Sequence, residues 1–76
     1  MEQVILPELG EGITQATVAF WHVKVGQKIS MDDDLVELVT DKAAFCVPAP
    51  KDGIVEEILV AEGQTARIGQ RLAIIG

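Results

Sequence analysis

Short apolar runs separated by turn-forming residues recur along the whole chain. Many of these runs are rich in β-branched residues and end at glycine, proline or aspartate, which is typical of strands. No segment carries an apolar stripe at helical spacing that lasts longer than a turn or two. The pattern predicts strands at residues 4–6, 16–23, 28–29, 35–40, 43–47, 54–60 and 72–75. The chain is therefore predicted to be all-β, a flattened sandwich or barrel.

The two halves of the chain repeat each other at a spacing of 37 residues, the distance from Gly26 to Gly63. The matched positions include Val18 with Val55, Val23 with Val60, Gln27 with Gln64, and Leu35 with Leu72. Two motifs of about four strands each cannot bury their apolar faces alone. Packed face to face they can, which predicts two four-stranded antiparallel sheets related by an approximate two-fold axis.

One charged pair, Asp41-Lys42, interrupts the apolar pattern between the strands predicted at 35–40 and 43–47. Two residues between two strands are typical of a β-hairpin, and a carboxylate at the first corner is expected to accept a local backbone N–H. Lys42 is therefore predicted at a hairpin tip. The repeat places the equivalent point just after Ile75, so this tip and the chain termini are expected at opposite poles. By itself, a lysine at a turn is most often only a solvated charge.

Composition narrows the classes of partner. The 76 residues predict a single domain, 1–76, and the 49% apolar content is enough for its core. The net charge of −6 argues against nucleic acid and anionic membranes, which need clustered Lys and Arg. No leader and no apolar run long enough to cross a bilayer is present. A bacterial cytoplasmic location is expected, or the mitochondrial matrix if a leader has been removed.

Candidate catalytic and metal-binding residues are few. Cys46 lies in an apolar run and is predicted to be a small buried hydrophobe. His22 has no second histidine or cysteine cluster with which to share a metal. The aspartates at 32–34 lack the alternating ligands and glycine of a calcium loop, and the acidic loop 8–14 lacks phosphate-binding spacing. We therefore expect no catalytic residue and no metal site, and predict a domain that is not itself an enzyme.

Several segments together resemble the lipoyl domains of 2-oxo acid dehydrogenase complexes, in the biotinyl/lipoyl attachment family, over essentially the whole chain. The matching segments are Leu6-Pro7-Glu8-Leu9-Gly10-Glu11-Gly12-Ile13, Trp21-His22-Val23-Lys24-Val25-Gly26, Thr40-Asp41-Lys42-Ala43, Val47-Pro48-Ala49-Pro50 and Gly53-Ile54-Val55. Each segment is weak alone, but their order and spacing are those of the family. The resemblance implies that the chain is a domain of a dihydrolipoamide acyltransferase.

The resemblance also implies roles for residues at the predicted tip. Lys42 would carry lipoic acid in amide linkage, and Asp41 and Ala43 would flank it for recognition by a lipoate-attaching enzyme. The lipoyl group would shuttle acyl groups and electrons between a thiamine-diphosphate-dependent decarboxylase, an acyltransferase core and the flavoprotein dihydrolipoamide dehydrogenase. The family's partner-recognition loop corresponds here to Glu8, Leu9, Gly10, Glu11, Gly12, Ile13 and Thr14. The form of this loop resembles that of pyruvate or branched-chain complexes.

Two departures from the family leave alternatives open. Many members have a glutamate three residues before the lysine, where this chain has Val39. Longer members continue into a linker, whereas this sequence ends at Gly76, so an excised domain or a free-standing carrier is expected.

Related biotin carriers have methionine on both sides of the lysine, whereas Lys42 is flanked by Asp41 and Ala43, which favours lipoyl attachment. A biotin carrier and an unmodified hairpin module remain as alternatives to the lipoyl carrier.

Overall fold

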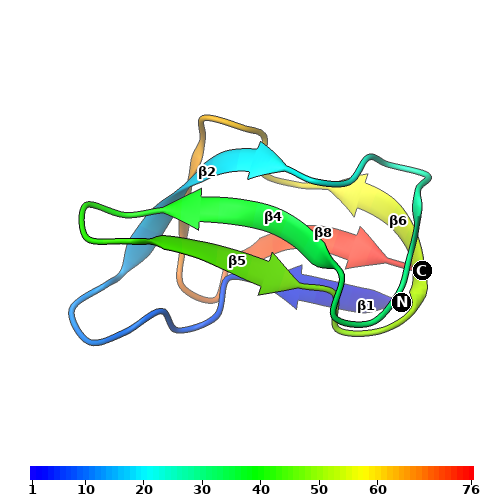
Figure 1. The fold of residues 1–76 in the computed structure, drawn as a ribbon, viewed down its shortest axis with the longest axis horizontal. Coiled ribbons are helices and arrows are strands. Elements are labelled where there is room, and N and C mark those ends of the chain that lie inside the picture. Colours follow the sequence, from blue (N-terminus) through cyan, green and yellow to red (C-terminus); the bar gives the residue numbers. More distant parts are fainter.

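The computed structural model describes all 76 residues and contains eight strands and no helix (Figure 1). The strands are β1 (Glu2–Ile5), β2 (Gln15–Trp21), β3 (Lys28–Ile29), β4 (Asp34–Val39), β5 (Ala44–Pro48), β6 (Gly53–Ile58), β7 (Thr65–Arg67) and β8 (Arg71–Ile75). The all-β prediction is confirmed. Because there is no helix, none is available that could cross a membrane.

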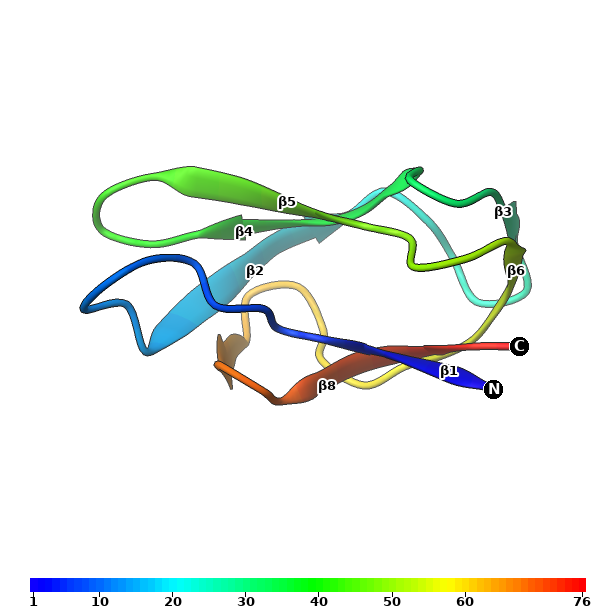
Figure 2. The ribbon, with the colours of Figure 1, turned by 90° about the horizontal axis from the view of Figure 1, so that it is seen from below.

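The strands form two four-stranded sheets, ordered β1-β8-β6-β3 and β5-β4-β2-β7, and every neighbouring pair is antiparallel. The sheets face each other across the core (Figure 2). Strand β7 was not among the predicted strands. It was nevertheless implied by the repeat, because a shift of 37 residues carries Lys28–Ile29 onto Thr65 and Ala66.

An approximate two-fold axis exchanges the sheets, taking β1–β4 onto β5–β8. Equivalent backbone hydrogen bonds make the symmetry specific. The N–H of Gly26 donates to the Val55 carbonyl at 2.7 Å, and the N–H of Gly63 donates to the Val18 carbonyl at 2.8 Å. Both glycines have positive φ, of 90° and 86°, which favours glycine in these turns. The predicted pseudo-symmetry is therefore confirmed down to single turns.

The core is wholly apolar. All 17 buried residues are hydrophobic, and no buried side-chain nitrogen or oxygen lacks a hydrogen-bond partner. Leu35 and Leu72, which the repeat superposes, are both fully buried. Trp21 is half-buried against this cluster, and its indole N–H donates to the Val60 carbonyl at 2.8 Å. Full burial of such leucines contributes roughly 1.5–3 kcal/mol each, so the core supplies the main driving force.

The sandwich is elongated, with extents of 33 × 20 × 17 Å. The turn between β4 and β5 lies at one end, and the N- and C-termini lie together at the other (Figure 1). The predicted separation of hairpin tip and termini is therefore confirmed. The scaffold holds one hairpin tip as far from its chain ends as its shape allows.

Candidate functional site

The β4–β5 hairpin ends in a tight turn whose two central residues are Asp41 and Lys42. The last residue pair of the strand ladder is Val39 with Ala44. Beyond it, the backbone N–H of Thr40 donates to the carbonyl of Ala43 at 2.9 Å. The predicted two-residue tip is present, and it continues directly from a four-stranded sheet.

The side chain that organises this turn is Thr40, not Asp41. Thr40 Oγ1 accepts the backbone N–H groups of Lys42 and Ala43, each at 3.2 Å, and donates to the Ala43 carbonyl at 3.2 Å. The prediction that Asp41 would accept the local N–H is wrong. A β-hydroxyl one position earlier already reaches both donors, in the manner of a serine/threonine turn.

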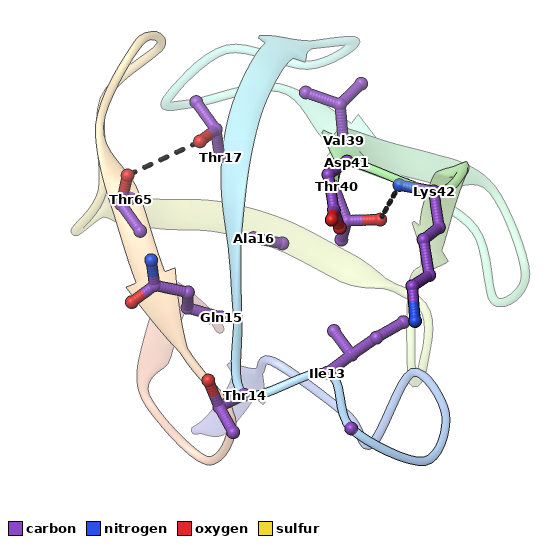
Figure 3. Close-up of a pocket in the computed structure, with 11 residues that line it drawn as sticks. Ile13, Thr14, Gln15, Ala16, Thr17, Val39, Thr40, Asp41, Lys42 and Thr65 are labelled. Carbon is purple, nitrogen blue, oxygen red and sulfur yellow. Dashed lines mark hydrogen bonds between the residues drawn. The ribbon is translucent and has the colours of Figure 1, made fainter.

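Lys42 is exposed at the tip. Its only hydrogen bond drawn in Figure 3 is that of its backbone N–H to Thr40, and its side chain extends along the rim of a groove toward Ile13. The side-chain amino group of Lys42 is therefore free, and the backbone that carries it is held by the turn. Its flanking residues Asp41 and Ala43 are exposed beside it, and their role in recognition stays a prediction.

The loop between β1 and β2 breaks the two-fold symmetry. Leu6 and Ala49 are equivalent, because each exchanges two backbone hydrogen bonds with the turn that precedes the last strand of one half. These bonds run from Leu6 N to Gln70 O (2.9 Å), Gly69 N to Leu6 O (2.8 Å), Ala49 N to Asp33 O (2.8 Å) and Asp32 N to Ala49 O (3.0 Å).

The loops that follow these two residues differ in length. Gln15 lies nine residues after Leu6, whereas its counterpart Asp52 lies three after Ala49. The first loop is therefore six residues longer.

The extra residues lie at the hairpin pole, beside the tip (Figure 2). Within the predicted recognition loop, Leu9 is half-buried and packs against the core, which anchors the loop. Glu8, Gly10 and Glu11 are exposed, and the loop closes through a 3.2 Å hydrogen bond from Ile13 N to Gly10 O. The remaining predicted residues, Gly12, Ile13 and Thr14, line a groove together with Asp41 and Lys42.

This groove, which we call the tip groove, has a volume of about 500 Å³. Its lining is Gly12, Ile13, Thr14, Gln15, Ala16, Thr17, Val39, Thr40, Asp41, Lys42 and Thr65. It opens where β2 and the hairpin diverge, since Thr17 is the last residue of β2 to pair with Val39 on β4. Gln15 and Ala16 extend past the end of β4 and pair only with β7, on the other edge of β2. The β2 and β7 members of the groove were missed by sequence reasoning, because they come together only through this divergence.

Cys46 is exposed, so the prediction of a buried cysteine is wrong. Along β5, Val47 is buried and Phe45 half-buried, whereas Ala44 and Cys46 face outward. Desolvation, then a hydrogen bond and charge repulsion from Asp34, raise the pKa of the Cys46 thiol. A raised pKa lowers the thiolate fraction, which argues against a nucleophilic role.

The acidic turn and His22 take part in local contacts. No group of three or more histidine, cysteine, aspartate or glutamate side chains could hold a metal ion. In the acidic turn, Asp33 Oδ2 accepts the backbone N–H of Ser30 at 2.8 Å, which is a local turn cap. His22 is exposed, and its ring packs edge-on against Phe20, with centroids 4.3 Å apart.

The β scaffold thus presents the Lys42 amine at its apex, at the end opposite the chain termini. The chain belongs to the biotinyl/lipoyl attachment family, whose model, described as "Biotin-requiring enzyme", matches residues 2–75, and within it to the lipoyl domains. Lipoyl domains are carrier domains without an active site of their own.

Proteins similar in sequence to this chain include acyltransferase components of the 2-oxoglutarate and pyruvate dehydrogenase complexes. The dihydrolipoyllysine-residue succinyltransferase component of the 2-oxoglutarate dehydrogenase complex of Staphylococcus saprophyticus is 40% identical over the whole chain, which spans 18% of that protein. The dihydrolipoyllysine-residue acetyltransferase component of the pyruvate dehydrogenase complex of Mycobacterium bovis is 41% identical over 96% of this chain and 13% of that protein. The chain thus spans less than a fifth of these relatives.

Solved structures agree with this assignment. The lipoyl domain of the 2-oxoglutarate dehydrogenase complex of Azotobacter vinelandii matches the whole chain and 96% of its own, with a TM-score of 0.81 at 34% identity. The lipoyl domain of the Escherichia coli succinyltransferase component matches 93% of the chain and 89% of its own, with a TM-score of 0.76 at 42% identity. Kluyveromyces lactis urea carboxylase, at 21% identity, 6% of its own length and a TM-score of 0.83, shares the fold.

Proposed function

We propose that residues 1–76 form one lipoyl domain of a dihydrolipoyllysine acyltransferase and that Lys42 carries lipoic acid in amide linkage. The observation that carries this proposal is the free amine of Lys42 at the apex of a rigid hairpin. Amide formation removes the ammonium charge, and Lys42 is not part of any core contact that this would disturb. The residues at the tip therefore fit the group.

The bound lipoyl group would supply a dithiolane that accepts acyl groups and electrons, and the protein would supply position and recognition. Thr40 fixes the backbone on either side of the attachment point. The turn is thereby held in one shape for a lipoate-attaching enzyme, with Asp41 and Ala43 as the flanking contacts. A scaffold that positions one side chain and leaves chemistry to a cofactor needs no general acid or base of its own.

We assign partner recognition to the loop from Glu8 to Thr14. Its six additional residues break an otherwise close symmetry, and they do so beside the only hairpin tip that presents a free lysine. The exposed carboxylates of Glu8, Glu11 and Asp41 give this pole a negative charge, which favours a basic surface on the partner. The proposed partners are a thiamine-diphosphate-dependent decarboxylase, the acyltransferase core and dihydrolipoamide dehydrogenase.

The similar acyltransferases come from both 2-oxoglutarate and pyruvate complexes. The preference for a pyruvate or branched-chain complex, drawn from the form of the loop at Gly10 to Ile13, therefore stays a prediction. The expected cytoplasmic location likewise stays a prediction.

The test is the intact mass of the domain after co-expression with a lipoate ligase and lipoic acid. The mass is expected to rise by one lipoyl group, and the increment is expected to vanish in Lys42→Ala. The matched control is Lys24→Ala, which removes another exposed lysine and is expected to keep the increment. An increment that survives in Lys42→Ala would contradict the assignment of this residue.

The same proteins decide between the alternatives. Retention on streptavidin after expression in biotin-replete cells, lost in Lys42→Ala, would establish a biotin carrier instead. An unmodified Lys42 in protein isolated from its native host would support the hairpin interaction module.

A further inference from the structure

We propose that the tip groove is a resting site for the lipoyl group carried by Lys42, with its aliphatic chain and dithiolane against Ile13, Ala16 and Val39. This inference rests on the proposed function, because it concerns where the attached group lies between partners. It assigns a binding role to residues from the first loop, β2 and β4 that the attachment reaction itself does not need.

The position of Lys42 is the first argument. Lys42 itself lines the groove, so a group attached to its amine is tethered at the rim of the site. A short flexible tether gives an effective concentration in the millimolar range. Contacts that would be too weak to hold a free ligand are then enough to populate a docked state. In Figure 3 the lysine side chain already extends along the rim toward Ile13.

The lining of the groove is the second argument. Its apolar members are Ile13, which is half-buried and lies beside the end of the lysine side chain, Ala16, which is buried, and Val39, which is 38% exposed. They leave apolar surface in contact with water that an aliphatic chain would cover. Thr14 and Gln15, which are exposed, line the part of the groove near β2.

Modification would control the docking. The unmodified lysine keeps its ammonium in water, since burying a charge without a partner is unfavourable. The amide form is uncharged and mostly apolar, so only the loaded side chain gains by lying in the groove. Because the groove is formed partly by the proposed recognition loop, a partner that binds Gly12 or Ile13 would compete with the docked arm and release it.

The test compares unmodified and lipoylated domain labelled with ¹³C in isoleucine and valine methyl groups, in a Cys46→Ser background that removes the other thiol. Lipoylation is expected to shift the methyl resonances of Ile13 and Val39 and to produce nuclear Overhauser contacts between these methyls and the lipoyl chain. The methyl groups of Ile54, which lies beside Gly76 at the opposite pole, are expected to stay in place.

A second readout is the alkylation rate of the reduced lipoyl thiols. Docking is expected to slow this reaction, so that Ile13→Ser and Val39→Thr speed it about two- to five-fold, whereas Ile54→Ser leaves it unchanged. The Ile54 resonances report whether Ile13→Ser and Val39→Thr are folded, and the Ile13 and Val39 resonances report this for Ile54→Ser. Unmoved Ile13 and Val39 methyls on a domain whose mass shows the lipoyl group would overturn the docking alone. A missing mass increment would overturn the proposed function, and the docking with it.

Discussion

Thr40 Oγ1 lies 3.2 Å from the backbone nitrogen of Lys42, and this bond connects the shape of the turn to the position of the amine. A second 3.2 Å bond from the Ala43 N–H to the same oxygen holds the chain on the other side of the lysine. The turn is therefore defined by a side chain that has no part in the attachment chemistry. This arrangement separates the shape of the site from its reactivity.

Replacing Thr40 with valine is expected to slow attachment without preventing folding. The variant keeps the β-branched shape but loses both accepted N–H bonds and the bond donated to Ala43, each worth about 0.5–1.5 kcal/mol. The rate of lipoylation by a ligase, followed by mass, is expected to fall several-fold. Thr65→Val is the matched control, because the Thr65 hydroxyl contacts only that of Thr17, at 3.4 Å, away from the turn. Equal rates for the two variants would contradict this role of Thr40.

Stability and function are expected to depend on different residues. Lys42→Ala removes an exposed side chain and should change the free energy of unfolding by less than about 0.5 kcal/mol. Leu72→Ala should cost about 2–4 kcal/mol, because Leu72 is fully buried. Its symmetry mate Leu35 is equally buried, so Leu35→Ala should cost a similar amount. Denaturant unfolding of the three variants measures these free energies. If Lys42→Ala were the least stable of the three, the result would contradict the architecture.

The loop between β1 and β2 is six residues longer than its symmetry mate between β5 and β6, and this difference allows a deletion test. Removing residues 8–13 would join Pro7 to Thr14 and match the shorter connection after Pro50. We expect the domain to fold, with some loss of stability from the missing Leu9 contact to the core. Lipoylation should persist, whereas reductive acylation by a partner decarboxylase should fall at least ten-fold. Unchanged acylation of the deletion variant would show that this loop is not the recognition element.

The symmetry also predicts how two turns respond to substitution. Asp32 has a φ of 73°, and its mate Gly69 has a φ of 86°. A left-handed backbone costs roughly 1–2 kcal/mol for most L-residues, and less for aspartate. Gly69→Ala should therefore destabilise the domain by about 1 kcal/mol, although no atom lies within 4 Å of the added Cβ. Asp32→Gly should be neutral within about 0.5 kcal/mol, since relief of backbone strain is offset by greater freedom of the unfolded chain. Thermal unfolding measures both, and a destabilised Asp32→Gly would show that the carboxylate has a role of its own.

The outcome of sequence reasoning differed between the fold and the site. The strands, the two sheets and the tip at Asp41-Lys42 followed from apolar periodicity and the internal repeat, because both are local or regular signals. Strand β7 was missed since Thr65–Arg67 is short and mostly polar. The role of Thr40 was missed because threonine and aspartate both favour turns, and only geometry separates them.

Two further features depend on tertiary structure. The exposure of Cys46 was mispredicted because the run from Ala43 to Val47 has no polar residue that marks its outer face. The tip groove could not be predicted at all, since it depends on where β2 extends past its last pair with β4, at Val39.

Cys46 gives a pH-dependent prediction. Its thiol pKa is raised in the folded chain, first by desolvation and then by Asp34, so the unfolded chain releases the proton at lower pH. The stabilisation associated with the protonated thiol is therefore complete below the unfolded pKa and is lost as pH rises through the folded pKa. Alkylation of unmodified domain by iodoacetamide should accordingly reach its half-maximal rate at higher pH than in urea-unfolded chain.

Asp34→Asn should move that point of half-maximal rate part of the way back, because the variant removes one carboxylate charge but leaves the desolvation and the charge of Glu37. The matched control is Glu57→Gln, an equal charge change on β6 in the other sheet, which should leave the profile unchanged. If the folded and unfolded chains react with the same pH profile, neither desolvation nor the neighbouring carboxylates raise the pKa of the outward thiol. In that case Cys46 would compete for the same alkylating and oxidising reagents as a dithiol carried on Lys42.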